Sequence, residues 1–162
     1  MLEPLSKFLY QKILSTLLEQ PNHILDSLYI LQAIEIERFP TDYLLVTFEV
    51  ESLYPDIPTQ EGILALRDML LHNTSILFSP EDVEFLVSVA ELVLKWNFLE
   101  FNDSFYQQIR GTAMGNNFAV VYDYIFLCRF EKEVNRGIPS LEIKLFKRFI
   151  DDGFLVWYGS QY

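Results

Sequence analysis

The sequence predicts an α+β fold in which helices pack on one face of a small antiparallel sheet. Apolar residues recur at helical spacing in both halves of the chain. Two pairs of β-prone runs are each joined by a short polar turn, and one further β-prone run stands alone between helical stretches. The predicted helices span 5–19, 22–35, 60–71, 80–95 and 116–133, and the predicted strands span 43–50, 97–101, 104–109, 144–149 and 154–157.

Length and composition are typical of one folded domain. The 162 residues are 51% hydrophobic and 15% aromatic, which is enough to form a core. The sequence has no apolar run long enough to span a membrane, so we expect no membrane partner. The N-terminus lacks the pattern of a secretory signal, and a lone Cys128 suits a reducing compartment. We therefore expect an intracellular protein, nuclear or cytoplasmic.

The first 50 residues predict two helices, a break and a strand. Pro21 ends the first helix, and the second opens near Asn22. The strand that follows, 43–50, is almost continuously apolar, which predicts burial on both of its faces. Glu49 is the one charged residue within it.

Local signals define the central elements. Thr59 is the expected N-cap of the helix 60–71. Ser79-Pro80 followed by two acids is a stronger helix start, with Ser as the N-cap and Pro at the first helical position. Asn102-Asp103 predicts a short hairpin turn. The glycines of 111–115 predict a flexible loop before the last helix, which we expect to be mostly buried.

Three features of the sequence point to one chemistry. Glu49 lies at the end of the apolar strand, glycines bracket the loop 111–115, and Asp151-Asp152 forms the tip of the final hairpin. Carboxylates from neighbouring strands suit a two-metal phosphoryl-transfer site, because Mg²⁺ prefers hard oxygen ligands. Each feature also has a simpler interpretation: an ordinary hairpin turn for the aspartates, a strand-end charge for Glu49 and a plain loop for the glycines.

The same segments resemble the palm motifs of reverse transcriptases. Val46–Pro58 resembles the first motif, Gln108–Gly115 the second, and Phe149–Asp152 the aspartate-pair motif. The segments SLYPDIP and GTAMG within these motifs are most similar to those of Penelope-like retroelement reverse transcriptases, which are relatives of telomerase. Each motif alone is a weak signal, and three in the family's order and spacing form a strong one. The resemblance covers roughly residues 5–157 and implies a reverse-transcriptase-like palm.

The resemblance also implies how the chain is divided. Residues 1–40 match the helical segment between fingers and palm, and residues 41–162 match the palm with its three motifs. The fingers, thumb and endonuclease regions of the family have no counterpart in the sequence.

The activity that the resemblance implies is RNA-directed DNA polymerisation by two-metal nucleotidyl transfer, a transferase activity of retrotransposons. Glu49, Asp151 and Asp152 are the expected catalytic carboxylates. Glu49, Asp151 and the carbonyl of Val50 are the expected ligands of Mg²⁺ or Mn²⁺.

The resemblance further implies which residues contact nucleic acid and nucleotide. Tyr54, Gln108 and Gly111 are the expected nucleotide-binding residues, with the Tyr54 ring under the sugar. Met114 and Gly115 are the expected template–primer contacts. The implied partners, in the full-length family context, are an RNA template, a DNA primer and deoxynucleoside triphosphates.

Departures from the family pattern favour a second hypothesis, a degenerate or repurposed palm that serves as an interaction module or is a relic. The first carboxylate is normally Asp, and the extra methylene of Glu49 moves the carboxylate by about 1–1.5 Å. A misplacement of about 1 Å costs roughly 10²-fold in rate. The helix after Gly115 begins with Asn116-Asn117 instead of the family's Lys and Pro-containing segment. The net charge of −11 opposes binding of a polyanion, although seven of the 12 basic residues lie in 110–162. We expect the isolated chain to be inactive as a polymerase.

Overall fold

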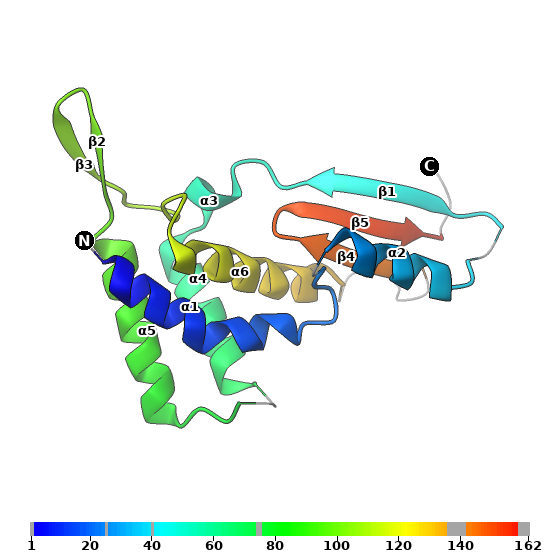
Figure 1. The fold of residues 1–162 in the computed structure, drawn as a ribbon, viewed down its shortest axis with the longest axis horizontal. Coiled ribbons are helices and arrows are strands. Elements are labelled where there is room, and N and C mark those ends of the chain that lie inside the picture. The colour runs from blue at the N-terminus through cyan, green and yellow to red at the C-terminus, as the bar shows by residue number, and fades with distance from the viewer. Residues whose placement is uncertain (1, 25, 40, 74–75, 136–141, 159–162) are drawn as a thin grey trace. The chain divides into compact units, whose positions relative to one another are not determined.

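The computed structural model describes residues 2–24, 26–39, 41–73, 76–135 and 142–158. Figure 1 shows its helices and strands, and the α+β composition expected from the sequence is confirmed. In chain order they are α1 (Glu3–Leu18), α2 (Ser27–Ile36), β1 (Leu44–Glu49), α3 (Leu53–Asp56), α4 (Thr59–Leu71), α5 (Pro80–Lys95), β2 (Phe98–Phe101), β3 (Ser104–Gln107), α6 (Asn117–Asn135), β4 (Ile143–Phe149) and β5 (Asp152–Trp157).

The chain forms two compact units, each built from segments that are distant in sequence. The first unit consists of Met1–Leu17 and Ser52–Arg129, and the second of Leu18–Glu51 and Phe130–Tyr162. The units cut across the division at residue 40 that the family resemblance implies. That division assigns regions by homology and stays a prediction. None of the helices in the described ranges combines the length and the hydropathy that crossing a membrane requires.

The first unit is helical, with a hairpin at one end. Its core consists of apolar side chains from four helices, among them Leu9, Ile13, Leu66, Val87, Phe118 and Ile125. α5 begins with the expected Ser79 cap: the Ser79 hydroxyl accepts from the Asp82 N–H, and the Asp82 carboxylate accepts from the Ser79 N–H. The expected N-cap of α4 is wrong by one position. Pro58 is the capping residue and Thr59 is already helical, because the ring of Pro58 holds an extended backbone just before the helix.

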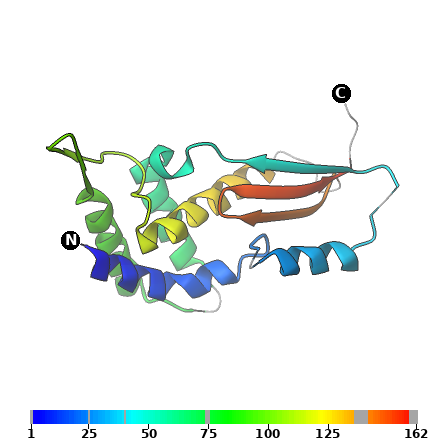
Figure 2. The same ribbon diagram turned by 45° about the horizontal axis from the view of Figure 1, so that its top comes forward.

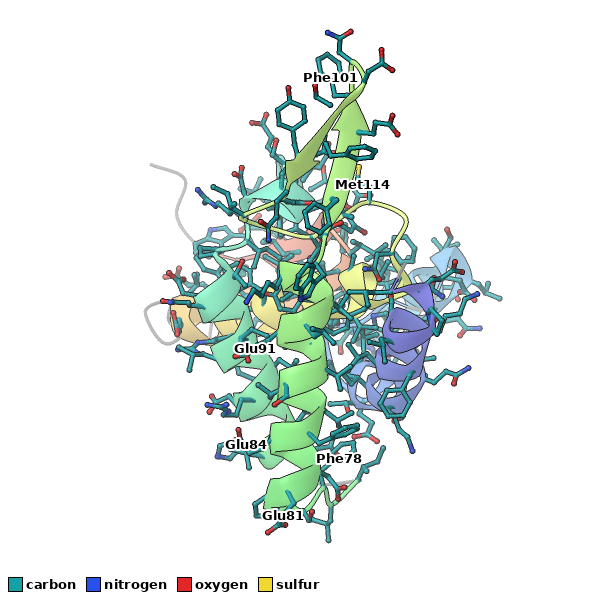
Figure 3. The ribbon with its side chains drawn as sticks, turned by 90° about the vertical axis from the view of Figure 1, so that its left-hand side faces the viewer. Phe78, Glu81, Glu84, Glu91, Phe101 and Met114 are labelled. Atoms are coloured by element: carbon teal, nitrogen blue, oxygen red, sulfur yellow. The ribbon has the colours of Figure 1, made fainter. Side chains whose placement is uncertain are left out.

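β2 and β3 form the expected hairpin, and both turn residues, Asn102 and Asp103, have positive φ. Figure 3 shows the hairpin extending past the end of α5, with Phe101 near its tip. Every residue of both strands is exposed, including Phe101 at 70% and Phe105 at 75%. The hairpin is therefore held by its own pairing and by contacts at its base.

The second unit contains a three-stranded antiparallel sheet in the order β1-β5-β4. The expectation that β1 is buried on both faces is wrong, because all six of its residues are exposed. β1 is an edge strand of this sheet, and Leu45 is 60% exposed. A continuous apolar run is the signature of a strand covered on both sides, but the sequence does not show where in a sheet a strand lies.

Helices contact both faces of this sheet, contrary to the expectation of one. The Lys147 ammonium lies over the Tyr29 ring of α2, 5.2 Å from its centroid, whereas Arg148 pairs with Glu131 of α6. Successive residues of a strand point to opposite faces, so these two contacts lie on opposite sides of β4. Figures 1 and 2 show α2 running alongside the sheet. α2 begins at Ser27 rather than near Asn22, because the Asp26 carboxylate caps it by accepting from the Tyr29 N–H.

Candidate active site

Glu49 and Asp152 face each other across two neighbouring strands of the second unit. β1 and β5 pair antiparallel, and the register places Glu49 directly opposite Asp152. Directly opposed residues point to the same face, with Cβ atoms about 4.5–5.5 Å apart. Both side chains are exposed. The last residue of β1 and the first residue of β5 thus present two carboxylates side by side at one end of the sheet.

Asp151 lies in the turn between β4 and β5 and is tied to β1 through its backbone. Its carbonyl accepts a hydrogen bond from the Val50 N–H at 3.0 Å. The family resemblance implies Asp151 as a metal ligand and Asp152 as a further catalytic carboxylate. In the structure Asp152 is the residue opposite Glu49, while Asp151 adjoins it at the turn. The three expected carboxylates and Val50 therefore lie at one end of one sheet.

A groove opens beside these carboxylates. It has a volume of about 560 Å³ and lies within the second unit. Glu49 and Asp152 line it together with Thr47 and Phe154, which share their face by alternation, and with Ile30 of α2. The groove thus combines two carboxylates with an apolar wall.

Glu49, Asp151 and Asp152 place three acidic side chains at this end of the sheet. Within the described ranges, none of Glu49, Asp151 and Asp152 takes part in an ion pair. Like charges directly opposite each other destabilise a sheet, and a bound cation removes that repulsion. The donor set, carboxylate oxygens and one backbone carbonyl, suits Mg²⁺ or Mn²⁺. The described part of the chain, however, contains no cluster of three or more His, Cys, Asp or Glu side chains arranged to hold a metal.

In the first unit, the structure brings Tyr54 and Gly111 together. The Gly111 N–H donates to the Ile57 carbonyl at 3.0 Å, and the Thr112 N–H donates to the Tyr54 carbonyl at 2.7 Å. α3, a short helix that the sequence did not predict, carries Tyr54 and is held by these bonds. Gly111 has φ +71°, and a Cβ on it would lie 2.2 Å from the Tyr54 carbonyl oxygen, so only glycine fits.

Met114 and Gly115 line a cavity in the first unit, with a volume of about 500 Å³. Tyr54, Tyr10 and Val120 line it too, so an expected nucleotide-binding residue and the expected template–primer residues share one hollow. Met114 is 78% exposed, and Gly115 has φ +88° with open space around it. This part of the loop is accessible from solvent.

The side chain of Gln108 forms hydrogen bonds with the glycine loop and with Asn97. Its side-chain amide donates to the Arg110 carbonyl at 2.8 Å and to the Thr112 carbonyl at 3.1 Å, and it accepts from the Asn97 amide at 2.7 Å. These bonds connect the base of the hairpin to the glycine loop. In the structure Gln108 therefore acts as a brace of the loop, and nucleotide contact by Gln108 stays a prediction.

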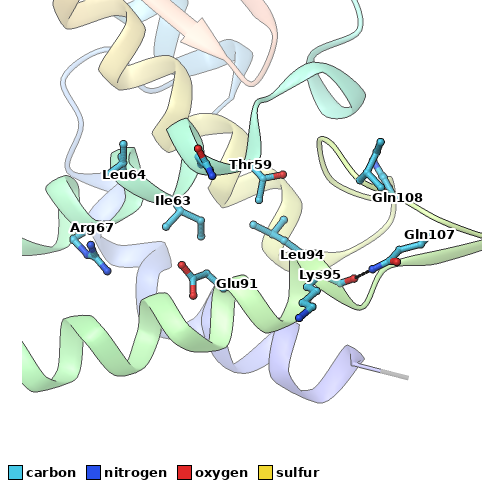
Figure 4. Close-up of a pocket in the computed structure, with 11 residues that line it drawn as sticks. Thr59, Ile63, Leu64, Arg67, Glu91, Leu94, Lys95, Gln107 and Gln108 are labelled. Carbon is cyan, nitrogen blue, oxygen red and sulfur yellow. Dashed lines mark hydrogen bonds between the residues drawn. The ribbon is translucent and has the colours of Figure 1, made fainter.

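A third cavity, of about 790 Å³, lies between α4, α5 and the hairpin base. Figure 4 shows Ile63 and Leu94 in the middle of its lining, with Arg67, Glu91 and Lys95 around them. The Gln107 amide donates to the Lys95 carbonyl at 2.7 Å. No sequence motif indicated this cavity, because its lining comes from three separate elements.

Comparison with solved structures identifies the fold. The telomerase-like fold is clear. Apo telomerase from Candida tropicalis superposes with a TM-score of 0.69 at 11% identity, covering 98% of this chain and 31% of that chain. Telomerase from Candida albicans, in complex with a TWJ fragment of telomeric RNA, gives 0.66 at 14% identity, covering 96% and 30%. A C. tropicalis telomerase truncated from its C-terminal domain gives 0.64 at 11% identity, covering 96% and 34%.

This likeness concerns the fold. The chain spans about a third of the length of the telomerase structures that it matches. Telomerase is a reverse-transcriptase relative, so the likeness agrees with the class of fold expected from the motifs. No protein-family model matches the sequence, and a comparison with curated proteins finds no match.

Sequence reasoning missed a hydrogen-bonded group close to the turn between β4 and β5. Arg148, Glu131 and Asn22 form a connected group in the second unit. The sequence did not single out Arg148, because the same strand also carries Lys144 and Lys147.

Proposed function

We propose that this chain is the palm region of a reverse-transcriptase-related nucleotidyltransferase of a retroelement. The observation that carries the proposal is the pairing of Glu49 with Asp152 on adjacent strands, with Asp151 at the turn between β4 and β5. A telomerase-like fold over at least 96% of the chain supports it. The finer assignment to Penelope-like elements rests on the SLYPDIP and GTAMG segments of the sequence.

In this proposal Glu49, Asp151 and Asp152 hold Mg²⁺ or Mn²⁺ through carboxylate oxygens, with the Val50 carbonyl beside them. Bound divalent ions would supply electrostatic stabilisation of the charge that develops on transferring phosphoryl oxygens. The protein's own contribution is to hold the carboxylates of β1 and β5 in register. The Val50–Asp151 backbone bond keeps the turn against β1.

Tyr54 and the loop at Gly111–Gly115 would contact the incoming nucleotide and the template–primer. The accessible hollow lined by Tyr54, Met114 and Gly115 supports this part of the proposal. An RNA template, a DNA primer and deoxynucleoside triphosphates would be the substrates. The acidic surface of the chain means that basic contacts to nucleic acid would have to come from elsewhere.

Metal binding tests the proposal on the chain itself. Mn²⁺ titration followed by electron paramagnetic resonance should show binding that the pair Asp151→Asn and Asp152→Asn abolishes. The matched control is Asp103→Asn, an exposed acid at the tip of the β2–β3 hairpin, which should leave binding unchanged. Binding that persists in the double variant would overturn the proposed site.

Primer extension with Mg²⁺ or Mn²⁺ tests the activity, on this chain and on any longer native product that contains it. We expect little or no extension by this chain alone. Extension by a longer product should be abolished by Asp151→Ala. Extension that survives this substitution would show that the chain does not supply the catalytic carboxylates.

The second candidate function is a non-catalytic palm that serves as an interaction module. Two observations favour it: the first carboxylate is Glu49 instead of Asp, and the β2–β3 hairpin exposes aromatic side chains on both faces. This candidate predicts neither Mn²⁺ binding nor extension. Metal binding that depends on Asp151 and Asp152, together with extension, would exclude it.

A further inference from the structure

Arg148 is fully buried beside the turn that carries the two aspartates. Its side chain is 1% exposed, although Arg is almost never buried without a partner. The register places Arg148 opposite Gly153, one position away from Asp152. By strand alternation Arg148 therefore points to the face opposite to that of Glu49 and Asp152. A substitution of Arg148 thus changes the support of the turn without changing the acidic face.

The guanidinium joins α6 to the turn between β4 and β5. Its Nε donates to the carboxylate of Glu131 on α6, and its Nη1 donates to the Ile150 carbonyl at 2.6 Å. Glu131 is itself mostly buried and accepts a bond from the Asn22 amide at 3.4 Å. The planar fork of Arg serves two acceptors at fixed angles, which the single ammonium of Lys does not reproduce.

The turn that Arg148 contacts has a conformation that needs support. Ile150 has φ +53°, in the left-handed region that a β-branched residue rarely adopts. Such a conformation persists only where the surrounding structure determines it. Arg148 holds the Ile150 carbonyl from the α6 side, and the Val50 N–H holds the Asp151 carbonyl from the β1 side. The two bonds fasten consecutive peptide groups of the turn.

The backbone of Arg148 is fastened as well. Its N–H donates to the Asn22 carbonyl at 2.7 Å, and its carbonyl accepts from the Ile24 N–H at 3.0 Å. The segment 22–24 thereby covers the outer edge of β4. These two backbone bonds hold β4 to the segment 22–24 next to the turn.

We infer that Arg148 is a positioning residue, which with Glu131 holds the Ile150–Asp151 turn so that Asp151 and Asp152 keep a fixed place beside Glu49. The role in metal binding rests on the proposed function, whereas the role in ordering the turn does not. The chain therefore uses a buried ion pair on one face of the sheet to order carboxylates that act on the other face.

Two measurements on Arg148→Lys test the inference. Amide hydrogen exchange at Asp151–Gly153 should be about tenfold faster than in the wild type, because local opening of the turn is no longer opposed by the bond to Ile150. The dissociation constant for Mn²⁺ should rise about tenfold, as is typical when a residue that orients metal ligands is replaced. Glu131→Gln, which keeps the size of the side chain and removes its charge, should change both quantities in the same direction by less.

Val156→Ala is the matched control for general destabilisation. Val156 is fully buried in β5, where it pairs with Leu45 and Leu145 at the end of the strand away from the turn, so its truncation weakens the same sheet by leaving a cavity. At equal loss of thermal stability, it should leave exchange at Asp151–Gly153 and Mn²⁺ affinity close to those of the wild type. Equal effects of Val156→Ala and Arg148→Lys on the turn would overturn the inference and make Arg148 an ordinary structural residue.

Amide exchange and Mn²⁺ affinity together distinguish a failure of this inference from a failure of the proposed function. If the wild-type chain binds no Mn²⁺, the proposed function fails and the exchange rates alone decide whether Arg148 orders the turn. If the wild type binds Mn²⁺ and both Arg148→Lys and Glu131→Gln leave turn exchange and affinity unchanged, the inference fails and the proposed function stands. If Arg148→Lys does not fold, Glu131→Gln decides by the same two readouts.

Discussion

The ring of Phe48 on β1 lies over the bare backbone of Gly153 on β5. The two residues are register partners, and a Cβ on Gly153 would lie 2.0 Å from Cζ of Phe48. The ring crosses β5 in this way and stacks on Phe146 of β4, with centroids 6.1 Å apart. One aromatic side chain thus spans all three strands, on the opposite face of the sheet from Glu49 and Asp152 and one register position away.

Gly153→Ala should therefore destabilise the sheet. The added methyl group displaces the Phe48 ring, and overpacking of this kind costs about 1–3 kcal/mol. Urea unfolding of the variant measures the loss. The companion Phe48→Leu, Gly153→Ala should lose less than the two single changes added together, because the shorter side chain leaves room for the methyl group. Simple additivity would contradict the contact.

Gly111 and Gly115 offer a matched comparison in the glycine loop. Gly111→Ala should cost about 1–3 kcal/mol, because the methyl group meets the backbone of α3, which has little room to move. Gly115→Ala should cost less, because its positive φ is unfavourable for Ala but its Cβ would enter open space. Urea unfolding of both variants tests the order. A larger loss at Gly115 would show that Gly111 is not packed against Tyr54.

His23 should make the second unit less stable in mild acid. Burial, with a smaller contribution from the positive charge of Arg148, lowers the pKa of His23 below its ordinary value of 6.5. Above that value the ring is neutral in both folded and unfolded chains. As the pH falls through 6.5, the unfolded chain takes up a proton that the folded chain resists, so the free energy of unfolding decreases.

Urea unfolding of the wild type and of His23→Gln from neutral pH to about pH 5 measures this contribution. The difference between the two proteins isolates His23 from the carboxylates that also titrate. The wild type should lose more stability than the variant over this range. Parallel curves would show that His23 has the same pKa in folded and unfolded chains.

Glu49→Asp tests whether the first carboxylate limits activity. Shortening the side chain by one methylene moves the carboxylate back by about 1–1.5 Å, to where an Asp carboxylate would lie in the proposed palm. In a longer native product that extends a primer, the rate should rise, by up to roughly 10²-fold. Glu49→Gln is the control of equal length and should abolish extension. An unchanged rate in Glu49→Asp would place the defect elsewhere.

Local signals in the sequence predicted most elements. Ser79-Pro80 and Asn102-Asp103 lie where they were expected, since caps and turns depend on residues a few positions apart. The final hairpin forms too, but β5 begins at Asp152, which the sequence had placed in the turn. β1 was placed correctly along the chain, but its burial was not, because burial depends on which strands flank it. α3 was missed, because four residues are too few to show a periodic pattern.

By itself, the sequence determined the types and order of the described elements other than α3, and it singled out Glu49, Asp151 and Asp152 as residues of interest. The tertiary structure alone decided that Asp152 is the residue opposite Glu49, that Gln108 braces its loop, and that Arg148 and Glu131 form a buried pair behind the aspartates. The physical reason is the distance along the chain over which each kind of interaction acts. Propensities, caps and turns act within a few residues, whereas strand register and buried ion pairs join residues whose separation along the chain carries no periodic signal.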